Sequence, residues 1–336
     1  MKQVVIPRYG PPEVLEVRDA PDPQAGAGEV RVRVAAAGIN FSDLLARQGL
    51  YPDAPKPPMV VGYEVAGTVD QLGAGVTTVR QGQRVVAMTM FKGQSELVVV
   101  PTDRVFPLPD DWTFEQGAAL PVVYLTAHHM LVRVAAARAG ESVLVHAAAG
   151  GVGLAVAELG KILGLRVIGL ASARKHDVLR EYGVEPLDSA DPRWWEAVRR
   201  VAPRGVDVVL DGVGGDSWRR GYALLAPAGR LLMYGASALI GGPRRNMLRV
   251  LWHVIRFPRF GPLALMNHNR AVVGVNLGHL TTAREMMDPQ ITALMQYARS
   301  GQIRPRVDRS FPFSEAAAAH HYIHERRNIG KVVLVP

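Results

Sequence analysis

Apolar and polar positions follow one pattern in the first third of the chain and another in the middle. Up to about residue 122, short alternating or clustered β-branched segments are broken by Pro and Gly, as is typical of an all-β region. From Thr113 the apolar spacing becomes helical, and apolar strands then alternate with helices as in βαβ units. The strands predicted in the first region are 1–7, 29–37, 62–72, 83–88 and 94–101.

Residues 142–159 are the most informative stretch, because an apolar strand leads through a glycine turn into a helix of small residues. Glycines let the backbone approach a pyrophosphate, and a helix N-terminus directs unpaired N–H groups at it. The spacing is Ala147-x-x-Gly150-x-x-Gly153, whereas G-x-G-x-x-G would need glycine at Val156. Such a turn can be purely structural, but further strands at βαβ spacing favour a dinucleotide-binding fold. Those strands are predicted at 166–171, 206–211 and 230–235.

The residues after the strand 166–171 distinguish the two nicotinamide cofactors, because an NAD site usually carries an acidic residue there for the ribose hydroxyls. Here Ser172, Arg174 and Lys175 supply a hydroxyl and two cations, and no carboxylate occurs before Asp177. We therefore predict NADPH as the cofactor. The alternative is that the two cations only begin a solvated helix.

Composition narrows the function classes. The 336 residues are 48% hydrophobic, which suffices for a large core and two domains. Cysteine is absent, so disulfides, thiolate nucleophiles and cysteine-based zinc sites are excluded. The sequence shows no leader-like segment and no apolar stretch near the roughly 20 residues of a membrane-spanning helix, so we expect a soluble, cytoplasmic protein.

The formal net charge of +9 is unevenly distributed, since residues 217–284 hold ten arginines and no Asp or Glu. A local anion site explains this bias more simply than nucleic-acid binding. Within it, residues 244–270 interleave apolar and aromatic side chains with arginines. Such a segment can bind an anionic membrane or an acidic partner, or pack its apolar face on the domain or on a second subunit, and we favour packing.

The last part of the chain returns to short elements. Helices are predicted at 283–300 and 311–325, and a final strand at 331–335. We expect this tail to rejoin the first domain. The predicted domains of this α/β protein are 1–122 with 275–336, and 123–274.

Several motifs together resemble one family over nearly the whole chain. They are Ala37-Gly38-Ile39-Asn40-Phe41-Ser42-Asp43, Val61-Gly62-Tyr63-Glu64, Tyr124-Leu125-Thr126-Ala127, the glycine turn, Asp211-Gly212-Val213-Gly214-Gly215 and Gly330-Lys331. The family is the medium-chain dehydrogenase/reductase superfamily, in its zinc-free quinone oxidoreductase (zeta-crystallin) branch. Vesicle amine transport protein homologues are the most similar group, through Ala171-Ser172-Ala173-Arg174-Lys175-His176, Gly242-Pro243-Arg244-Arg245-Asn246 and Asn269-Arg270-Ala271-Val272.

The resemblance implies a GroES-like β-barrel domain and a Rossmann domain with a doubly wound parallel sheet. It also implies NADPH in the cleft between them and a homodimer formed through Rossmann edges. Zinc-dependent relatives carry Cys at the position of Asn40 and His at that of Tyr63, so no metal site is expected. The adjacent pairs His128-His129 and His320-His321 diverge by about 100° on a helix and form no metal clip.

Without a metal, a reductase needs hydrogen-bond donors where oxygen charge develops. The resemblance places Asn40 at the cleft, where it would bond a substrate oxygen or the nicotinamide ribose. Tyr51 lies in the proline-rich loop 49–58, where a phenol can donate a proton or a hydrogen bond and can stack on a flat quinone. Each candidate has a structural alternative, such as shaping a turn, capping the helix predicted at 44–48, or filling a strand or loop. The catalytic candidates are Asn40, Asp43, Tyr51 and Tyr63.

The resemblance also implies the cofactor contacts. Thr126 would touch the nicotinamide, whereas Ser189 stands where many relatives have a tyrosine beside the adenosine phosphate. Arg326 and Lys331 would close over the cofactor from the tail, or be solvated cations. The cofactor-binding candidates are Thr126, Gly150, Gly151, Val152, Gly153, Ser172, Arg174, Lys175, Gly235, Asn276 with its neighbour Leu277, and Lys331.

These observations predict a metal-free NADPH-dependent oxidoreductase that transfers hydride to a quinone or an α,β-unsaturated carbonyl compound. The alternative is an NADPH-binding protein that binds lipid, membrane or a partner and has little catalysis. The basic segment shows no aromatic platform for stacking bases, so nucleic acid is not an expected partner. The sequence leaves the acceptor and the proton donor open.

Overall fold

The computed structural model describes residues 1–280 and 283–336, and the chain divides into two compact units. Unit 1 comprises Met1–Val122, Gly242–Arg245 and Pro305–Pro336, and unit 2 comprises Val123–Gly241 and Asn246–Arg304. In this division residues 275–304 belong to unit 2, whereas the sequence grouped them with the first domain. The domain limits themselves stay a prediction.

Unit 1 is built on a seven-stranded sheet with the order β14-β15-β3-β4-β5-β7, in which β6 also pairs with β3. The first two strands, β1 and β2, form a separate two-stranded antiparallel sheet. The strands are β1 (Lys2–Val5), β2 (Glu16–Asp19), β3 (Glu29–Gly38), β4 (Glu64–Leu72), β5 (Arg84–Met88), β6 (Leu97–Pro101), β7 (Val105–Pro107), β14 (Val307–Pro312) and β15 (Lys331–Val335). The helices are α1 (Phe41–Arg47), α2 (Phe114–Ala118) and α11 (Ala316–His324).

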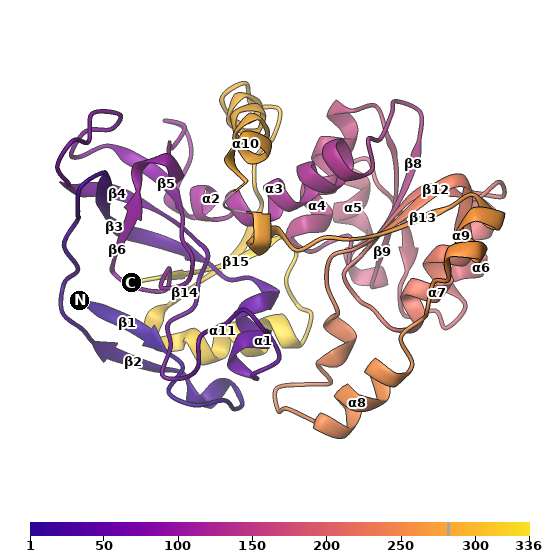
Figure 1. Ribbon diagram of the computed structural model, residues 1–336, viewed down its shortest axis with the longest axis horizontal. Coiled ribbons are helices and arrows are strands. Elements are labelled where there is room, and N and C mark those ends of the chain that lie inside the picture. Colours follow the sequence, from indigo (N-terminus) through magenta and orange to yellow (C-terminus); the bar gives the residue numbers. More distant parts are fainter. Residues whose placement is uncertain (281–282) are drawn as a thin grey trace. The chain divides into compact units, whose positions relative to one another are not determined.

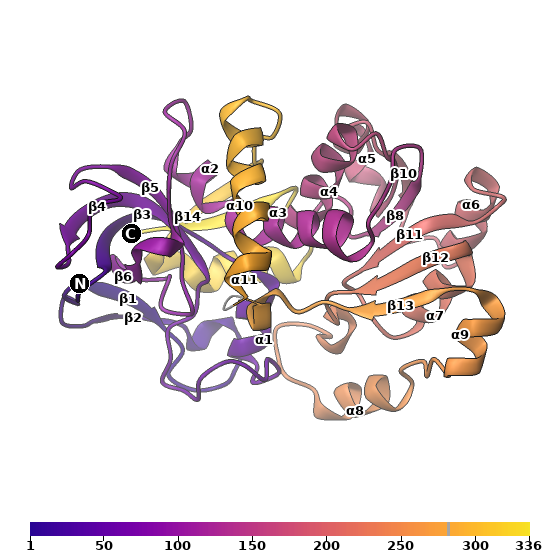
Figure 2. The ribbon, with the colours of Figure 1, turned by 45° about the horizontal axis from the view of Figure 1, so that its top comes forward.

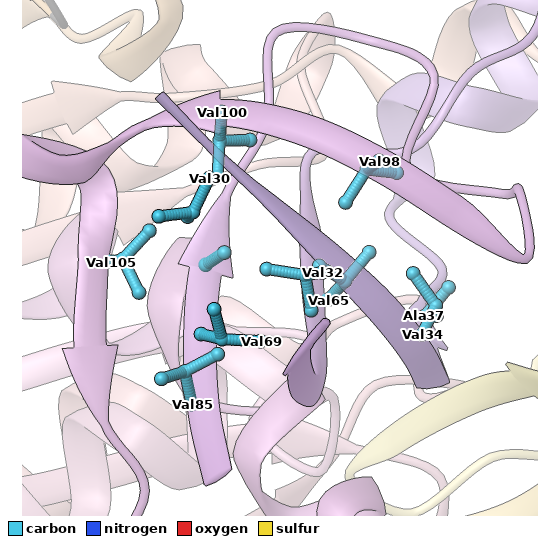
Figure 3. Close-up of a cluster of buried hydrophobic side chains, with 11 residues drawn as sticks. Val30, Val32, Val34, Ala37, Val65, Val69, Val85, Val98, Val100 and Val105 are labelled. Atoms are coloured by element: carbon cyan, nitrogen blue, oxygen red, sulfur yellow. The ribbon is translucent and has the colours of Figure 1, made fainter. Parts of the chain in front are cut away.

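Valines from five strands form the core of unit 1 (Figure 3). Along β3 the buried and less buried positions alternate, so that one face of the strand turns into this core. β-branched side chains suit such a pleated, half-buried surface. The cluster consists of Val30, Val32, Val34 and Ala37 of β3, Val65 and Val69 of β4, Val85 and Ala87 of β5, Val98 and Val100 of β6, and Val105 of β7.

Unit 2 contains a six-stranded parallel sheet with the order β10-β9-β8-β11-β12-β13 (Figures 1 and 2). This is the doubly wound order, whose connections reverse direction between β8 and β11, and ligands bind outside the carboxyl ends of such strands. The strands are β8 (Ser142–His146), β9 (Arg166–Ala171), β10 (Glu185–Asp188), β11 (Val206–Asp211), β12 (Leu225–Met233) and β13 (Ala271–Gly274). The helices are α4 (Gly151–Ile162), α5 (His176–Glu181), α6 (Trp194–Val201), α7 (Asp216–Leu224), α8 (Met247–Ile255), α9 (Pro262–His268) and α10 (Arg284–Arg299). The helix α3 (Pro121–His128) begins in unit 1 and continues in unit 2.

Local signals explain where several helices begin. Thr113 and Gln116 form a capping box at the start of α2. The Asn246 side chain accepts the Arg249 N–H at 2.9 Å at the start of α8, and Pro262 occupies the first turn of α9. The predicted strands of the first region and the helix start at Gly151 are confirmed.

Other predicted elements differ from the structure. The helix predicted at 311–325 was wrong in its first part, because residues 307–312 form β14 and α11 begins at Ala316. The reason is long-range pairing, since β14 runs parallel to β15. The helix predicted at 44–48 is α1, which already begins at Phe41. In the region of helical spacing after Thr113, α3 changes to a π-helix at residues 129–134.

Candidate functional site

The turn between β8 and α4 lies at the point in unit 2 where the sheet order reverses. Ala147 has a positive φ of 54°, and Gly150 is the N-cap residue of α4. In the described structure no side chain caps this helix, and its first turn contains no acidic residue. Because the first N–H groups of a helix have no intrahelical partner, the amides of Gly151–Gly153 are donors at the positive end of the helix dipole.

Close packing explains the last glycine of this turn. A Cβ at Gly153 would lie 2.2 Å from the carbonyl oxygen of Ala148, so only glycine lets α4 start this close to the turn. At Gly150 and Gly151 the nearest atoms would lie 3.2 Å and 3.0 Å from a Cβ, so those positions are tight but not closed. This cradle of backbone donors, with no acidic residue in the first turn of α4, fits a pyrophosphate group.

The residues after β9 carry the predicted cation pair. Ser172 is half-buried, Arg174 is exposed, and the Lys175 side chain is buried, with 7% of its surface exposed. The His176 ring donates from Nε2 to the Ala171 carbonyl oxygen at 3.1 Å, which holds the start of α5 against the end of the strand. A hydroxyl and two cations at this strand end fit the charge of a phosphate group.

Sequence reasoning missed a buried pair at the ends of the neighbouring strands β8 and β11. Asp211 accepts the N–H groups of Val213 and Gly214 on Oδ1, at 2.7 and 3.2 Å. In the described residues its Oδ2 has no hydrogen-bond partner and lies 3.6 Å from Nε2 of His146, which also has none. The sequence contained a signal for this pair, because His146 and Asp211 each end an apolar strand directly before a glycine-containing turn.

The remaining cofactor candidates of unit 2 lie on separate elements. Thr126 is buried on α3, with 8% of its surface exposed. Gly235 follows β12, where a Cβ would lie 2.9 Å from the Gly212 carbonyl oxygen. Asn276 is exposed and accepts the Gly278 N–H on its side-chain oxygen at 3.1 Å.

In unit 1 the structure joins Asn40, Glu64 and Lys331 into a closed triangle. Lys331 Nζ donates to Oδ1 of Asn40 at 2.6 Å and to Oε1 of Glu64 at 2.5 Å. Asn40 Nδ2 donates to the same Glu64 oxygen at 2.9 Å, and Oε2 of Glu64 accepts the Val122 N–H at 2.7 Å. Sequence reasoning missed Glu64 as a site residue, although Glu64 accepts hydrogen bonds from Asn40, Lys331 and the Val122 N–H.

Asp43, Tyr51 and Tyr63 lie in the same unit. Asp43 is fully buried on the first turn of α1 and accepts the Asn40 N–H on Oδ2 at 2.8 Å, so it caps that helix. The Tyr63 ring contacts Tyr51 edge-on, with 6.3 Å between the ring centroids, and Phe91, with 5.1 Å. Burial raises the pKa of both phenols.

The adjacent histidines have separate partners. His128 and His129 both contact the Gln290 amide, at 3.3 Å each, and burial lowers the pKa of both rings. His320 accepts from buried Arg47, whereas His321 pairs with Glu13 at 2.6 Å. Over residues 1–280 and 283–336, no group of three or more His, Asp or Glu side chains is arranged to hold a metal ion.

Comparisons with known proteins agree with this architecture. An alcohol dehydrogenase GroES-like domain matches residues 26–110, and a zinc-binding dehydrogenase domain matches residues 184–334. The synaptic vesicle membrane protein VAT-1 homolog of Rattus norvegicus is 41% identical over 327 residues, which cover 96% of this chain and 80% of the relative. The chain belongs to the medium-chain dehydrogenase/reductase superfamily.

Two solved members of this superfamily resemble the whole chain. Escherichia coli quinone oxidoreductase complexed with NADPH superposes with a TM-score of 0.88 at 28% identity and covers 100% of both chains. CurK enoyl reductase gives 0.87 at 26% identity, with 99% of this chain and 98% of that one covered. The protein is therefore an oxidoreductase of the quinone oxidoreductase-like type, with a GroES-like N-terminal domain and a Rossmann-like sheet.

Proposed function

We propose that this protein is a metal-free, NADPH-dependent oxidoreductase that transfers hydride to a quinone or an α,β-unsaturated carbonyl compound. The observation that carries the proposal is the donor cradle at the start of α4, combined with Ser172, Arg174 and Lys175 after β9. The related quinone oxidoreductase of Escherichia coli is described as complexed with NADPH. The positions at which zinc-dependent relatives have Cys and His hold Asn40 and Tyr63 here.

The roles follow from the chemistry of each group. The amides of Gly151, Val152 and Gly153 would bind the pyrophosphate, and the residues after β9 would bind the 2′-phosphate. Thr126, Gly235 and Asn276 remain proposed cofactor contacts. When bound, NADPH would supply the hydride.

Asn40 is the proposed ligand of the acceptor oxygen. Its amide carries two N–H groups, of which Glu64 accepts one, so the second is the proposed donor to the acceptor. Lys331 holds the opposite side of the same amide. We therefore propose that Lys331 orients Asn40 and does not itself contact the cofactor.

Cofactor binding is tested first by fluorescence titration with NADPH and NADH. We expect NADPH to bind more tightly, and Arg174→Ala and Lys175→Ala each to weaken NADPH binding by roughly 10- to 150-fold, since hydrogen bonds to charged groups contribute about 1.5–3 kcal/mol. Lys161→Ala, at an exposed position near the end of α4, is the matched control and should bind normally. Equal binding of NADPH by all variants would remove the 2′-phosphate site from the proposal.

Catalysis is tested by NADPH oxidation with a series of quinones and enones. Turnover of at least one acceptor above background supports the reductase. If none is turned over by protein that binds NADPH, the proposal fails. The homodimer implied by the resemblance stays a prediction, to be checked by light scattering.

A second candidate function, contact with an anionic membrane, is favoured by the exposed face of α8. Leu248, Leu251, Trp252 and Ile255 recur at helical spacing and are 53–80% exposed. The chain directly after α8 is anchored, since Phe257 packs on Trp218 of α7 with 4.8 Å between the ring centroids. In both ribbon views α8 stands apart from the strands of its unit (Figures 1 and 2).

The positive charge around the apolar face of α8 favours contact with an anionic membrane over contact with a second copy of the chain. Exposed arginines flank it at Arg249, Arg256 and Arg259, and residues 217–283 contain no carboxylate side chain. Two copies would repel each other through such a face, whereas anionic lipid would attract it. Among the helices the structure describes, none is long and apolar enough to cross a bilayer, so the proposed contact is peripheral. The rat relative is named a synaptic vesicle membrane protein.

Vesicle flotation separates the two candidates. With phosphatidylserine vesicles we expect co-flotation that is lost in neutral vesicles and in the double variant Leu251→Glu/Ile255→Glu. Leu72→Glu, at an exposed apolar position of β4, is the control. Failure to float with either vesicle would reject the membrane candidate and leave the reductase proposal untouched.

A further inference from the structure

The neighbouring parallel strands β8 and β11 carry a polar pair at each end. At the amino ends, the Oγ and the N–H of Ser142 both donate to Oδ2 of Asp207, each at 2.8 Å. At the carboxyl ends, His146 faces Asp211 with 3.6 Å between Nε2 and Oδ2. The first pair is therefore closed by hydrogen bonds, whereas the second is open.

The open pair is buried. Asp211 is 0% exposed and His146 is 6% exposed, and among the described residues neither Oδ2 of Asp211 nor Nε2 of His146 has a hydrogen-bond partner. Native proteins rarely keep two such atoms facing each other, because each unpaired atom is destabilising. The Trp194 ring packs edge-on against the imidazole with 5.0 Å between the ring centroids, which orients the imidazole. Since an N–H···O hydrogen bond is about 2.7–3.2 Å long, a shift of less than about 1 Å would close the pair.

The two pairs lie at opposite edges of the sheet. The order of strands reverses between β8 and β11, and a ligand of a doubly wound sheet binds outside the carboxyl ends at this point. His146 directly precedes the turn that leads into the donor amides of α4, and Asp211 directly precedes the loop 212–215. The pair that lacks its hydrogen bond is thus the one at the edge where the cofactor is proposed to bind.

Asp211 and the loop 212–215 are held from within and on the side of β12. Oδ1 of Asp211 accepts two N–H groups of this loop, at 2.7 and 3.2 Å. Three backbone hydrogen bonds of 2.8–3.1 Å join Asp211 and the loop to the chain after β12, from the N–H groups of Tyr234, Ser237 and Ala238. On the side of β8, the Asp211 carboxyl group meets His146 without a hydrogen bond. The turn after β8 and the loop after β11 can therefore approach each other by closing this pair.

We propose that His146 and Asp211 form a clasp that closes when the cofactor binds, an inference that rests on the proposed cofactor site. The pyrophosphate draws the turn after β8 and the loop after β11 together, and Nε2 of His146 then donates a hydrogen bond to Oδ2 of Asp211. No proton is transferred. Both are positioning residues, because they act on the two loops and do not contact the cofactor.

The first test observes the clasp itself. In protein labelled with nitrogen-15 at histidine, the side-chain N–H signal of His146 is identified by its absence from His146→Gln and His146→Phe. On addition of NADPH, this signal in the wild type should move downfield and its proton should exchange more slowly with water, as a new hydrogen bond to a carboxylate requires. A signal that NADPH leaves unchanged would overturn the clasp.

The second test measures affinity for NADPH and NADH by fluorescence titration. His146→Phe keeps a ring against Trp194 but removes the donor, so it should weaken both cofactors equally, by about 10- to 150-fold. The losses should be equal because the two cofactors share the pyrophosphate, whereas variants of Arg174 and Lys175 should weaken NADPH alone. His146→Gln, whose amide can donate at a similar reach, should retain most of the affinity.

Ser142→Ala is the matched control, because it removes a hydrogen bond between the same two strands at the opposite edge. It should lower the melting temperature and leave both affinities unchanged. An unchanged affinity in His146→Phe, or a loss of the same size in Ser142→Ala or in His146→Gln, would overturn the clasp while the cofactor site stands. Wild-type protein that binds neither cofactor would instead defeat the proposed function itself.

Discussion

Replacing Lys331 by methionine would remove the cation at the centre of unit 1. Lys331 opens β15, Glu64 opens β4, and Asn40 is the N-cap of α1, two residues after β3 ends, so one ammonium group links two strand starts to a helix start. Lys331 is 4% exposed and Glu64 is 0% exposed. Methionine keeps most of the side-chain volume, so the change isolates the charge and its hydrogen bonds.

The expected loss can be estimated from the contacts that remain. Removing one partner of a buried ion pair costs about 3–5 kcal/mol, because the other charge stays buried. Glu64 keeps the N–H groups of Asn40 and Val122, so we expect the lower end, about 3 kcal/mol. With a urea m-value of about 2 kcal/mol/M, the unfolding midpoint would fall by roughly 1.5 M.

The assay is urea unfolding followed by far-UV circular dichroism and by fluorescence, for which the buried Trp112 reports on unit 1. Lys331→Arg, which keeps the charge, should lose less than Lys331→Met. The double variant Lys331→Met/Glu64→Gln should recover most of the loss, since no uncompensated charge remains. A single variant within about 1 kcal/mol of wild type, or a double variant that is no better than the single one, would refute the reasoning.

Two further predictions concern other parts of the fold. Gly153→Ala should destabilise unit 2 by about 1–3 kcal/mol in a thermal melt, because its Cβ would meet the Ala148 carbonyl oxygen at 2.2 Å; Gly274→Ala, with no atom within 4 Å, should be neutral, and equal melting of the two would contradict the packing argument. His324 accepts from buried Arg47 at 2.6 Å, and burial lowers its pKa from 6.5 to about 4. The unfolded chain therefore binds more protons, so stability should fall as the pH drops from 6.5 to about 4, and His324→Gln should flatten that fall; an unchanged slope would contradict it.

Local patterns predicted the elements whose signals lie within a few residues. Apolar spacing and glycine positions predict a strand, a glycine turn and a helix within residues 142–159, and the structure has β8 and α4 there. The helix predicted from residue 311 failed for the opposite reason. Residues 307–312 are held as a strand by β15, and nothing in their own sequence records that distant partner.

The candidate site shows the same limit. Sequence reasoning selected Asn40, but its partners Glu64 and Lys331 lie 24 and 291 residues away. Lys331 reaches Asn40 because β15, near the end of the chain, pairs with β3. The spacing of apolar residues does not predict that long-range strand pairing. Likewise, the apolar stripe of α8 left packing and membrane contact open, and only the fold shows that it is exposed in the single chain.

The buried polar side chains of unit 1 are of two kinds, those whose polar groups have hydrogen-bond partners and those that keep an oxygen without one. In the triangle of Asn40, Glu64 and Lys331, each side chain has a partner, and these hydrogen bonds fix the orientation of the Asn40 amide. Asp43 and Tyr63 each retain a buried oxygen without a hydrogen-bond partner among the described residues, and burial raises the pKa of both groups. Because the Lys331 charge lowers the pKa of Asp43, Lys331→Met should both reduce the unfolding free energy and raise that pKa. Carbon-13 NMR of aspartate-labelled protein would measure this shift, and an Asp43 carboxyl group whose pKa is the same in Lys331→Met and in the wild type would show that the two kinds of group do not act on each other.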